Sequence, residues 1–186
     1  MIRQLLAALR IVLVLTVLLG VVYPLAVTAA AGLTMPGRAG GSLVQSGGEV
    51  VGSSLIGQEF SGPEWFHGRV DPFNPAASGA SNLAPSNQQL AQVTRAAVLE
   101  AQRIEAWTGL IPADAVTGSG SGLDPHISPE YARLQAPRVA AARGLDGDEV
   151  LALVDRLTEG RTLGFLGEPR VNVLLLNLAL VASSRD

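Results

Sequence analysis

The feature that most constrains this chain is an apolar stretch over residues 11–33, IVLVLTVLLGVVYPLAVTAAAGL, which contains no charged side chain. As a helix, roughly 23 residues extend about 34 Å, enough to cross a hydrocarbon core of about 30 Å. Backbone amides find no water inside lipid, so a helix is the form that this stretch must take there. The sequence therefore predicts a transmembrane helix over residues 11–33, with everything after it on one side of a membrane.

Two other interpretations of the stretch stay open. A cleaved secretory signal also begins with positive residues, here Arg3 and Arg10, and the alanines at 29–31 resemble a cleavage site. Its apolar region, however, normally has only about 7–15 residues. A buried helix of a soluble core is the other interpretation, although such a helix seldom lacks a polar face over this length. The length of the stretch favours the membrane anchor over both.

The arginines predict the orientation of the anchor. Arg3 and Arg10 precede it, whereas the nearest positive residue after it is Arg38. Cytoplasmic flanks carry the excess of positive charge, so we expect residues 1–10 in the cytoplasm and the large domain outside. The Gly- and Ser-rich residues 34–49 are typical of a linker. Residues 50–186 then have the size of a single extracytoplasmic domain.

Composition limits the chemistry of this domain. The formal net charge is −3, and the chain has two histidines, His67 and His126, no cysteine and no lysine. Without a basic block, nothing indicates a nucleic acid as a partner. Without cysteine there is no disulfide, thiolate or zinc–sulfur chemistry, and two histidines give no reason to expect a metal site. We therefore predict no bound metal.

The hydrophobic pattern predicts a mixed α/β domain. A strand is expected at Val50–Val51, continuing through residues 54–56, and proline-rich residues 60–85 read as an irregular segment whose aromatic side chains pin it to the core or meet a partner. A helix is expected over 87–107, capped by Ser86 or Asn87, and a strand over 111–116. A second helix is expected from Pro129, interrupted near Pro137 and ending at Gly144, and a third starts at 146–149. The apolar run over 171–181 can begin as a strand and become helical, and periodicity alone does not separate the two.

The glycine-rich residues 118–128, GSGSGLDPHIS, are the main candidate for a functional site. Glycines let backbone amides approach a ligand, and a helix start follows at Ser128 and Pro129, so a phosphate compound is one candidate ligand. The chain has no lysine for a phosphate-binding Walker motif, and Leu123 breaks the dinucleotide pattern. Ser121, Asp124 and His126 have the residue types of a hydrolase triad but lie close together in one loop. A turn-rich connector, with Asp124 and Ser128 satisfying backbone amides, is the third interpretation.

Other polar residues are weaker candidates. His67, Arg69 and Asp71 sit together in the irregular segment, where charges are usually just solvated. Asn172 and Asn177 lie inside an apolar run; because buried amides need partners, they either knit the core or meet another subunit.

Five segments in combination resemble the C subunits of Kdp-type potassium-transporting ATPases. They are GSSLIGQEF (52–60), SGASNLAPSN (78–87), VTGSGSGLDPHIS (116–128), LQAPRVAAARG (134–144) and GFLGEPRVNVLLLNLAL (164–180). With the apolar stretch they span nearly the whole chain in family order.

The resemblance implies a single-pass inner-membrane protein that is not an enzyme by itself. Its implied role is that of a catalytic chaperone, which raises the affinity of the P-type ATPase subunit for ATP in a high-affinity potassium uptake complex. The implied partners are that catalytic subunit, a potassium-conducting channel-like subunit, a small membrane subunit and the lipid bilayer. The implied nucleotide contacts, and with them ATP as a ligand, fall on Ser119, Gly120, Ser121, Gly122, Asp124, His126, Ser128 and Gln135.

The orientation and the implied nucleotide contacts disagree, because cytoplasmic ATP does not reach a loop outside the membrane. The arginine distribution favours a different task, in which the domain braces the outer mouth of the potassium-conducting subunit. Two alternatives stay open beside this subunit role: a membrane-tethered hydrolase using Ser121 and His126, and a module holding a phosphate compound at residues 118–128.

Overall fold

The computed structural model describes residues 1–71 and 73–183. The chain divides into two compact units, Met1–Leu43 and Val44–Asp186. Each is described here by itself.

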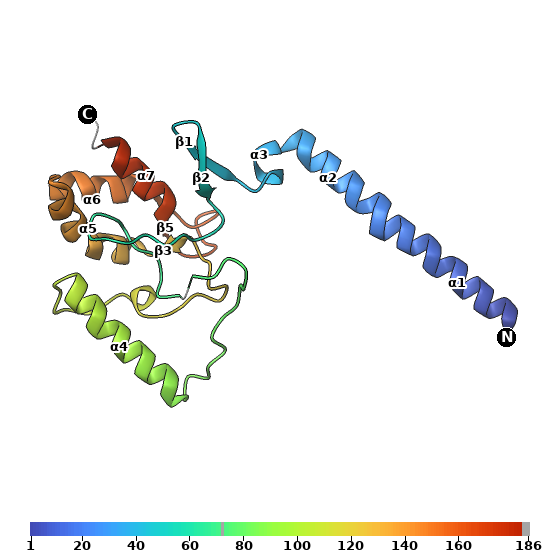
Figure 1. The fold of residues 1–186 in the computed structure, drawn as a ribbon, viewed down its shortest axis with the longest axis horizontal. Coiled ribbons are helices and arrows are strands. Elements are labelled where there is room, and N and C mark those ends of the chain that lie inside the picture. Colours follow the sequence, from blue (N-terminus) through green and yellow to red (C-terminus); the bar gives the residue numbers. More distant parts are fainter. Residues whose placement is uncertain (72, 184–186) are drawn as a thin grey trace. The chain divides into compact units, whose positions relative to one another are not determined.

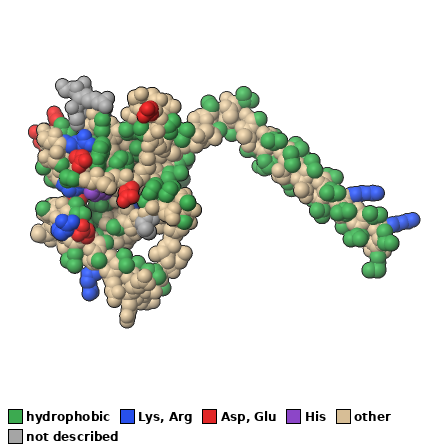
Figure 2. Space-filling model, in the orientation of Figure 1, with side chains coloured by type: hydrophobic (Ala, Val, Ile, Leu, Met, Phe, Trp, Pro, Cys, Tyr) green, Lys and Arg blue, Asp and Glu red, His purple; other side chains and the backbone are tan. Residues whose placement is uncertain are grey.

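The first unit is a long apolar helix. It runs without a break through α1 (Ile2–Val17), the π-helical turn η1 (Leu18–Val22) and α2 (Tyr23–Thr34), and a short helix α3 (Pro36–Ala39) follows. Its helical turns therefore begin at Ile2, upstream of the predicted span over 11–33. Apolar side chains cover it along its length (Figure 2). Over Ile2–Thr34 the helix is long and apolar enough to cross a membrane, and an 18-residue stretch within it has a mean hydropathy of 2.8. This is consistent with a single-pass membrane protein.

The π-helical turn has a local cause. Pro24 lies within the helix, has no N–H to donate to the carbonyl of Gly20, and its ring crowds that carbonyl. The chain widens there, and the N–H of Tyr23 donates to the carbonyl of Leu18, five residues back. A π turn thus absorbs the proline without ending the helix.

A β-hairpin begins within the predicted linker over residues 34–49 and includes the predicted strand at Val50–Val51. Strand β1 (Leu43–Ser46) pairs with β2 (Glu49–Ser53). Gly47 and Gly48 join them with φ of 61° and 88°. Two successive positive φ values match the tight turn that suits the twist of a hairpin, and glycine adopts them without strain. The glycines at 47–48 therefore mark a turn, and β2 ends at Ser53 rather than continuing through residues 54–56.

The middle of the domain is mostly irregular. The long segment after β2 leads to α4 (Gln88–Ile104), which stands apart from the later helices (Figure 1). Asn87 caps α4, as predicted, by accepting a hydrogen bond from the N–H of Gln89 at 2.8 Å. The predicted strand over 111–116 is wrong: residues Ala113–Ala115 form the 3-10 turn η2, because Pro112 and the hydrogen bonds closed by the N–H groups of Ala115 and Val116 turn the chain.

The later part of the chain forms a small sheet with three helices. Strands β3 (His126–Ile127), β4 (Thr158–Glu159) and β5 (Arg170–Asn172) pair antiparallel in the order β3-β5-β4, with Val171 opposite both Ile127 and Thr158. Helices α5 (Pro129–Arg143), α6 (Gly147–Arg156) and α7 (Val173–Ser183) pack on one another beside it (Figure 1). The mixed α/β character of the domain is confirmed, and so is the change from strand to helix in the final apolar run.

Helix α5 corrects one prediction. It passes through Pro137 without interruption. Pro137 and Arg133 are both on the exposed side of α5, so the helix accommodates the loss of the hydrogen bond to the Arg133 carbonyl at its solvent-facing surface. The predicted ends are right: Ser128 caps the start, and Gly144 ends the helix in the left-handed conformation with φ of 66°.

The core lies between these helices, the sheet and one irregular segment. Phe66, Ala132, Val139, Leu176 and Leu180 are completely buried. Phe66 belongs to the proline-rich segment, so that segment is pinned to the core at this aromatic residue.

Candidate functional site

The glycine-rich loop is held by hydrogen bonds between its own residues. Ser119 Oγ accepts from the N–H of Gly122 at 2.8 Å, and Ser121 Oγ accepts from the N–H of Leu123 at 3.1 Å. Asp124 Oδ1 accepts from the N–H of His126 at 3.0 Å. These side chains thus satisfy the loop's own amides, as in the turn-rich connector that was one of the three interpretations.

A carboxylate from the irregular segment occupies the place where an anion would bind. Asp71 accepts the N–H of Ser119 with both oxygens, at 3.0 and 2.8 Å. Gly118 makes this approach possible, since a Cβ there would lie 2.4 Å from Asp71 Oδ1. A phosphate at this amide would have to displace a carboxylate that already carries the same charge sign.

Arg69 joins the same two segments. Its guanidinium donates to the carbonyl of Gly118 at 2.8 Å and to the carbonyl of Thr117 at 3.2 and 3.3 Å. It also lies 3.9 Å from a carboxylate oxygen of Asp124. Arg69 and Asp71 are thus structural partners of the loop, a role that their place in a proline-rich stretch did not reveal.

The residues of the suggested triad do not form a relay. His126 Nδ1 lies 3.1 Å from Asp124 Oδ1, and this hydrogen bond is the main cause that lowers the pKa of Asp124. Ser121 Oγ contacts Leu123 N and lies 3.5 Å from Ser119 Oγ. Within the described residues no hydrogen bond joins Ser121 to His126, so the Asp–His pair does not activate the Ser121 hydroxyl.

The hydroxyl and the N–H of Ser128 are already hydrogen-bonded at the start of α5. Its hydroxyl accepts from the N–H of Tyr131 at 3.0 Å and donates to Asp114 Oδ1 at 2.9 Å. Its own N–H donates to Asp114 Oδ2 at 2.6 Å. This network fixes the helix start to the 3-10 turn η2.

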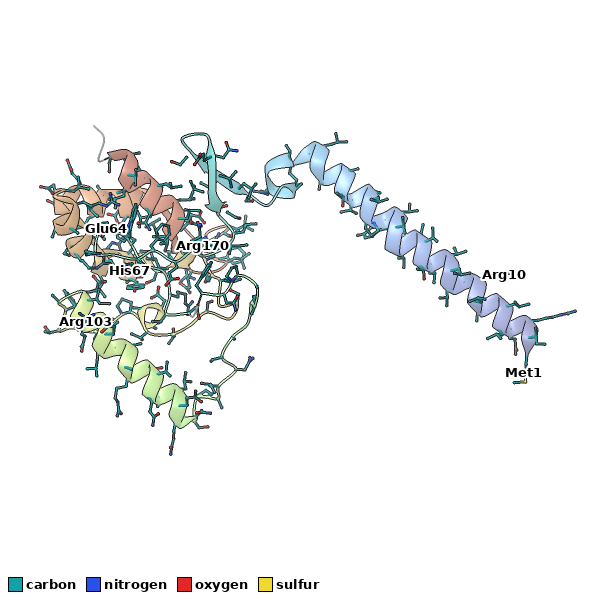
Figure 3. The ribbon with its side chains drawn as sticks, in the orientation of Figure 1. Met1, Arg10, Glu64, His67, Arg103 and Arg170 are labelled. Carbon is teal, nitrogen blue, oxygen red and sulfur yellow. The ribbon has the colours of Figure 1, made fainter. Side chains whose placement is uncertain are left out.

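Gln135 is fully buried and lies away from the loop residues that were grouped with it. Its Oε1 accepts from the N–H of His67 at 2.7 Å, and its Nε2 donates to the carbonyl of His67 at 3.0 Å. Asn177 does the same one residue earlier: its side-chain amide accepts from the N–H of Phe66 and donates to its carbonyl, both at 2.9 Å. The two amides act as strand partners for the Phe66–His67 segment, which we call the clamped segment (Figure 3 labels His67).

A third amide completes this pattern. Asn172 Nδ2 donates to the carbonyl of Ser54 at 2.9 Å, and its Oδ1 accepts from the N–H of Leu175 at 3.2 Å. Of the two alternatives for Asn172 and Asn177, the structure supports the one in which they knit the core. The buried position of these amides in apolar surroundings was the signal for it.

Two arginines of α5, Arg138 and Arg143, contact residues 63–65, which directly precede the clamped segment. Arg138, whose side chain is 10% exposed, pairs with Glu105 at 3.0 Å and donates to the carbonyls of Pro63 and Trp65 at 2.6 and 3.0 Å. Arg143 lies over the Trp65 ring, 4.4 Å from its centroid. These arginines therefore bind backbone and a ring face of the irregular segment, and Arg143 also lies in the last turn of α5, where a positive charge interacts favourably with the helix dipole.

A cavity of about 290 Å³ adjoins the loop. Its lining includes Arg69, Asp71, Asp124 and Tyr131, and burial raises the pKa of Tyr131 to about 12. Pockets for small molecules typically span about 300–1,000 Å³, so this one is at the small end. Gln135 and Ser128 are not among its lining residues.

His67 gives the domain a pH dependence. Burial is the main cause that lowers its pKa below the ordinary 6.5, against an opposing hydrogen bond to the carbonyl of Gly62. At pH values between the folded pKa of His67 and 6.5, the unfolded chain binds more protons than the folded domain does. The contribution of the neutral His67 to the free energy of unfolding is therefore complete above pH 6.5 and is lost as the pH falls below it. We expect the melting temperature to fall between pH 7.5 and 5.5 and the fall to be smaller in His67→Asn, as measured by thermal unfolding. An equal fall in both proteins would contradict this origin.

Comparison with known proteins places this arrangement in a family. Residues 5–182 match the family model described as "KdpC: K+-transporting ATPase, c chain". Similar curated proteins, each named "Potassium-transporting ATPase KdpC subunit", include one from Rhodopseudomonas palustris, 47% identical with 100% of both chains covered. Another is from Kineococcus radiotolerans, 53% identical with 97% of this chain and 94% of the relative covered. The chain therefore belongs to the KdpC family, the c chains of potassium-transporting ATPases.

Proposed function

We propose that this chain is an accessory subunit that assembles and stabilises a high-affinity, ATP-driven potassium uptake complex and supports ATP binding by its P-type ATPase subunit. One observation carries the proposal: the family match runs from residue 5 to residue 182, so the apolar helix and the domain belong to it together. The partners are the catalytic subunit, the potassium-conducting subunit and a small membrane subunit, within the lipid bilayer of the inner membrane.

The geometry supports a role in binding rather than in catalysis. Side-chain amides and the partly buried Arg138 hold irregular segments by hydrogen bonds to their backbone, which gives the domain a preformed surface. Ser121 and His126 are not joined by a hydrogen bond, so the hydrolase alternative lacks its activated nucleophile. We place this domain outside the membrane, where it braces the mouth of the potassium-conducting subunit.

Purification tests the subunit role. An affinity tag at the C-terminus of the full chain is expected to recover the catalytic and potassium-conducting subunits in comparable amounts from native membranes after mild detergent extraction. ATP hydrolysis by the remaining subunits is expected to need a higher ATP concentration when this chain is left out. Recovery of the tagged chain without larger membrane proteins would overturn the proposal.

Reporter fusions test the orientation. The arginines before the apolar helix predict that a C-terminal alkaline phosphatase, which is active only outside the cytoplasm, will be active. A C-terminal green fluorescent protein exported in the same way is expected to stay dark. Fluorescence together with an inactive phosphatase would place the domain in the cytoplasm.

Direct nucleotide contact is the second candidate, and the cavity beside residues 122–125 is the observation that favours it. Against it stand the Asp71 carboxylate on the Ser119 amide and the burial of Gln135. We expect millimolar ATP to leave the melting temperature of the full chain unchanged, because the amides of Ser119, Gly122 and Leu123 are already hydrogen-bonded within the domain. An increase that depends on ATP concentration and is lost in Arg69→Gln would instead establish a nucleotide site.

A further inference from the structure

The cavity beside the glycine-rich loop carries an excess of negative charge. Its described lining includes three carboxylates and one guanidinium, those of Glu59, Asp71, Asp124 and Arg69. His67 also lines it and is neutral at pH 7, because burial lowers its pKa. Three negative charges against one positive charge give the lining a formal charge of −2. This charge favours a cation in the cavity and disfavours a phosphate compound.

The hydrogen-bond donors around the cavity are already used. Arg69 directs Nε and Nη2 to backbone carbonyls of the loop, and its Nη1 lies 3.9 Å from Asp124 Oδ2. The N–H of Ser119 is bound to Asp71. An ionised carboxylate offers about four acceptor positions, so these contacts leave acceptor positions open on both aspartates. An occupant of this cavity must therefore bring the donors itself.

Tyr131 adds a buried hydroxyl to the same lining. The residue lies at the start of α5 and is only 7% exposed. Its backbone N–H is bonded to Ser128, but in the part of the chain that the structure describes its hydroxyl has no hydrogen-bond partner. Burial raises the pKa of Tyr131 to about 12, so the hydroxyl keeps its proton. A buried hydroxyl without a partner costs free energy, and an occupant that bonds to it removes this cost.

The acceptors are arranged for an organic cation rather than for a metal ion. Over residues 1–71 and 73–183, no three Asp, Glu or His side chains are placed to hold a metal. The rings of Phe60 and Phe73 line the cavity together with that of Tyr131. An ammonium group donates three hydrogen bonds to separate acceptors, while the carbon skeleton that carries it packs against aromatic rings.

We propose that this cavity binds a small organic cation, a primary amine on a short apolar arm, through the Tyr131 hydroxyl and the carboxylates of Asp71 and Asp124. A cavity of about 290 Å³, at the small end of ligand pockets, suits a molecule of this class. The site lies entirely within residues 56–174 of this chain. It therefore does not depend on the proposed subunit role, and each can fail without the other.

Three compounds with one carbon skeleton test the preference for a cation. Phenylethylamine, phenylethanol and phenylacetate are cationic, neutral and anionic at neutral pH. Titration calorimetry of the full chain in detergent is expected to show saturable binding of the amine, at least about tenfold tighter than that of the alcohol and weaker at high salt. No binding is expected for phenylacetate. Binding of either control as tight as that of the amine, or no saturable binding of the amine, would overturn the proposal.

Single substitutions test whether the amine binds in this cavity. Tyr131→Phe removes only the unpaired hydroxyl, so it is expected to weaken phenylethylamine binding at least about threefold without lowering the melting temperature. Glu59→Gln removes one negative charge from the lining and is expected to weaken binding about two- to fivefold. Glu149→Gln is the matched control, because Glu149 is exposed on α6 outside this lining, and its affinity is expected to be unchanged. Equal affinities in all three variants would overturn the site.

Discussion

Replacing Arg138 by alanine is expected to lower the free energy of unfolding of the domain by about 3–5 kcal/mol. The Arg138 and Glu105 side chains are 10% and 3% exposed, so removing one charge leaves the other buried without its partner. The variant also loses the two hydrogen bonds to the carbonyls of Pro63 and Trp65. Chemical denaturation of the full chain in detergent, followed by tryptophan fluorescence, measures the loss.

Arg133 provides a matched control on the same helix. It pairs with Asp155 at 2.8 Å, but the two side chains are 47% and 61% exposed. Exposed pairs contribute about 0–1 kcal/mol, so Arg133→Ala is expected to change the free energy of unfolding by no more than that. If both variants lost the same amount, burial of the Arg138–Glu105 pair would not be the cause of its effect.

The sequence predicted best those features whose physics is local. Asn87 and Ser128 cap their helices, and Gly144 ends α5, because each needs only neighbours within a few residues. The apolar helix was likewise evident from its composition. In the last apolar run, by contrast, periodicity does not separate strand from helix, and the pairing of β5 with β3 and β4 decides its first residues.

Features that depend on distant residues were not predictable in the same way. Strands β3 and β4 have two residues each and exist because β5 pairs with both. Helix α5 continues through Pro137 because that residue faces water, which the amino-acid order does not show. The strand at Val50–Val51 is confirmed within β2, but the sequence does not predict its partner β1, because the Gly- and Ser-rich composition of residues 34–49 indicates a linker rather than a specific turn.

The candidate site shows the same division. The loop residues were found from glycine content, yet their partner Asp71 lies 48 residues away from Ser119. Gln135 was grouped with the loop by resemblance, whereas its hydrogen bonds go to His67, 68 residues away. Asn177 was recognised as unusual in an apolar run, but its partner Phe66 is 111 residues earlier. Polar residues can be identified as buried from the sequence; their partners require the fold.

Replacing Asn177 by leucine is the second large effect that we expect. Leucine has a similar size, so little cavity forms, but the N–H and carbonyl of Phe66 both lose the side-chain amide that pairs with them in the core. Each buried backbone group left unsatisfied costs about 1–3 kcal/mol, so the free energy of unfolding is expected to fall by about 2–6 kcal/mol. Asn87→Ala, which removes a single exposed helix cap, is the control and is expected to cost about 1 kcal/mol.

Aspartate at the same position separates lost hydrogen bonds from altered packing. A protonated carboxyl group in Asn177→Asp still accepts from the N–H of Phe66 and donates to its carbonyl, whereas the ionised form cannot donate. The pKa of the aspartate in the folded variant is therefore raised above the unfolded value of about 3.9. At pH values between these two pKa values, the folded variant binds more protons than its unfolded chain does. The stability of this variant, relative to the unsubstituted chain, should rise as the pH falls toward 4. A deficit that does not change with pH would mean that packing, not the two hydrogen bonds to Phe66, holds the clamped segment in the core.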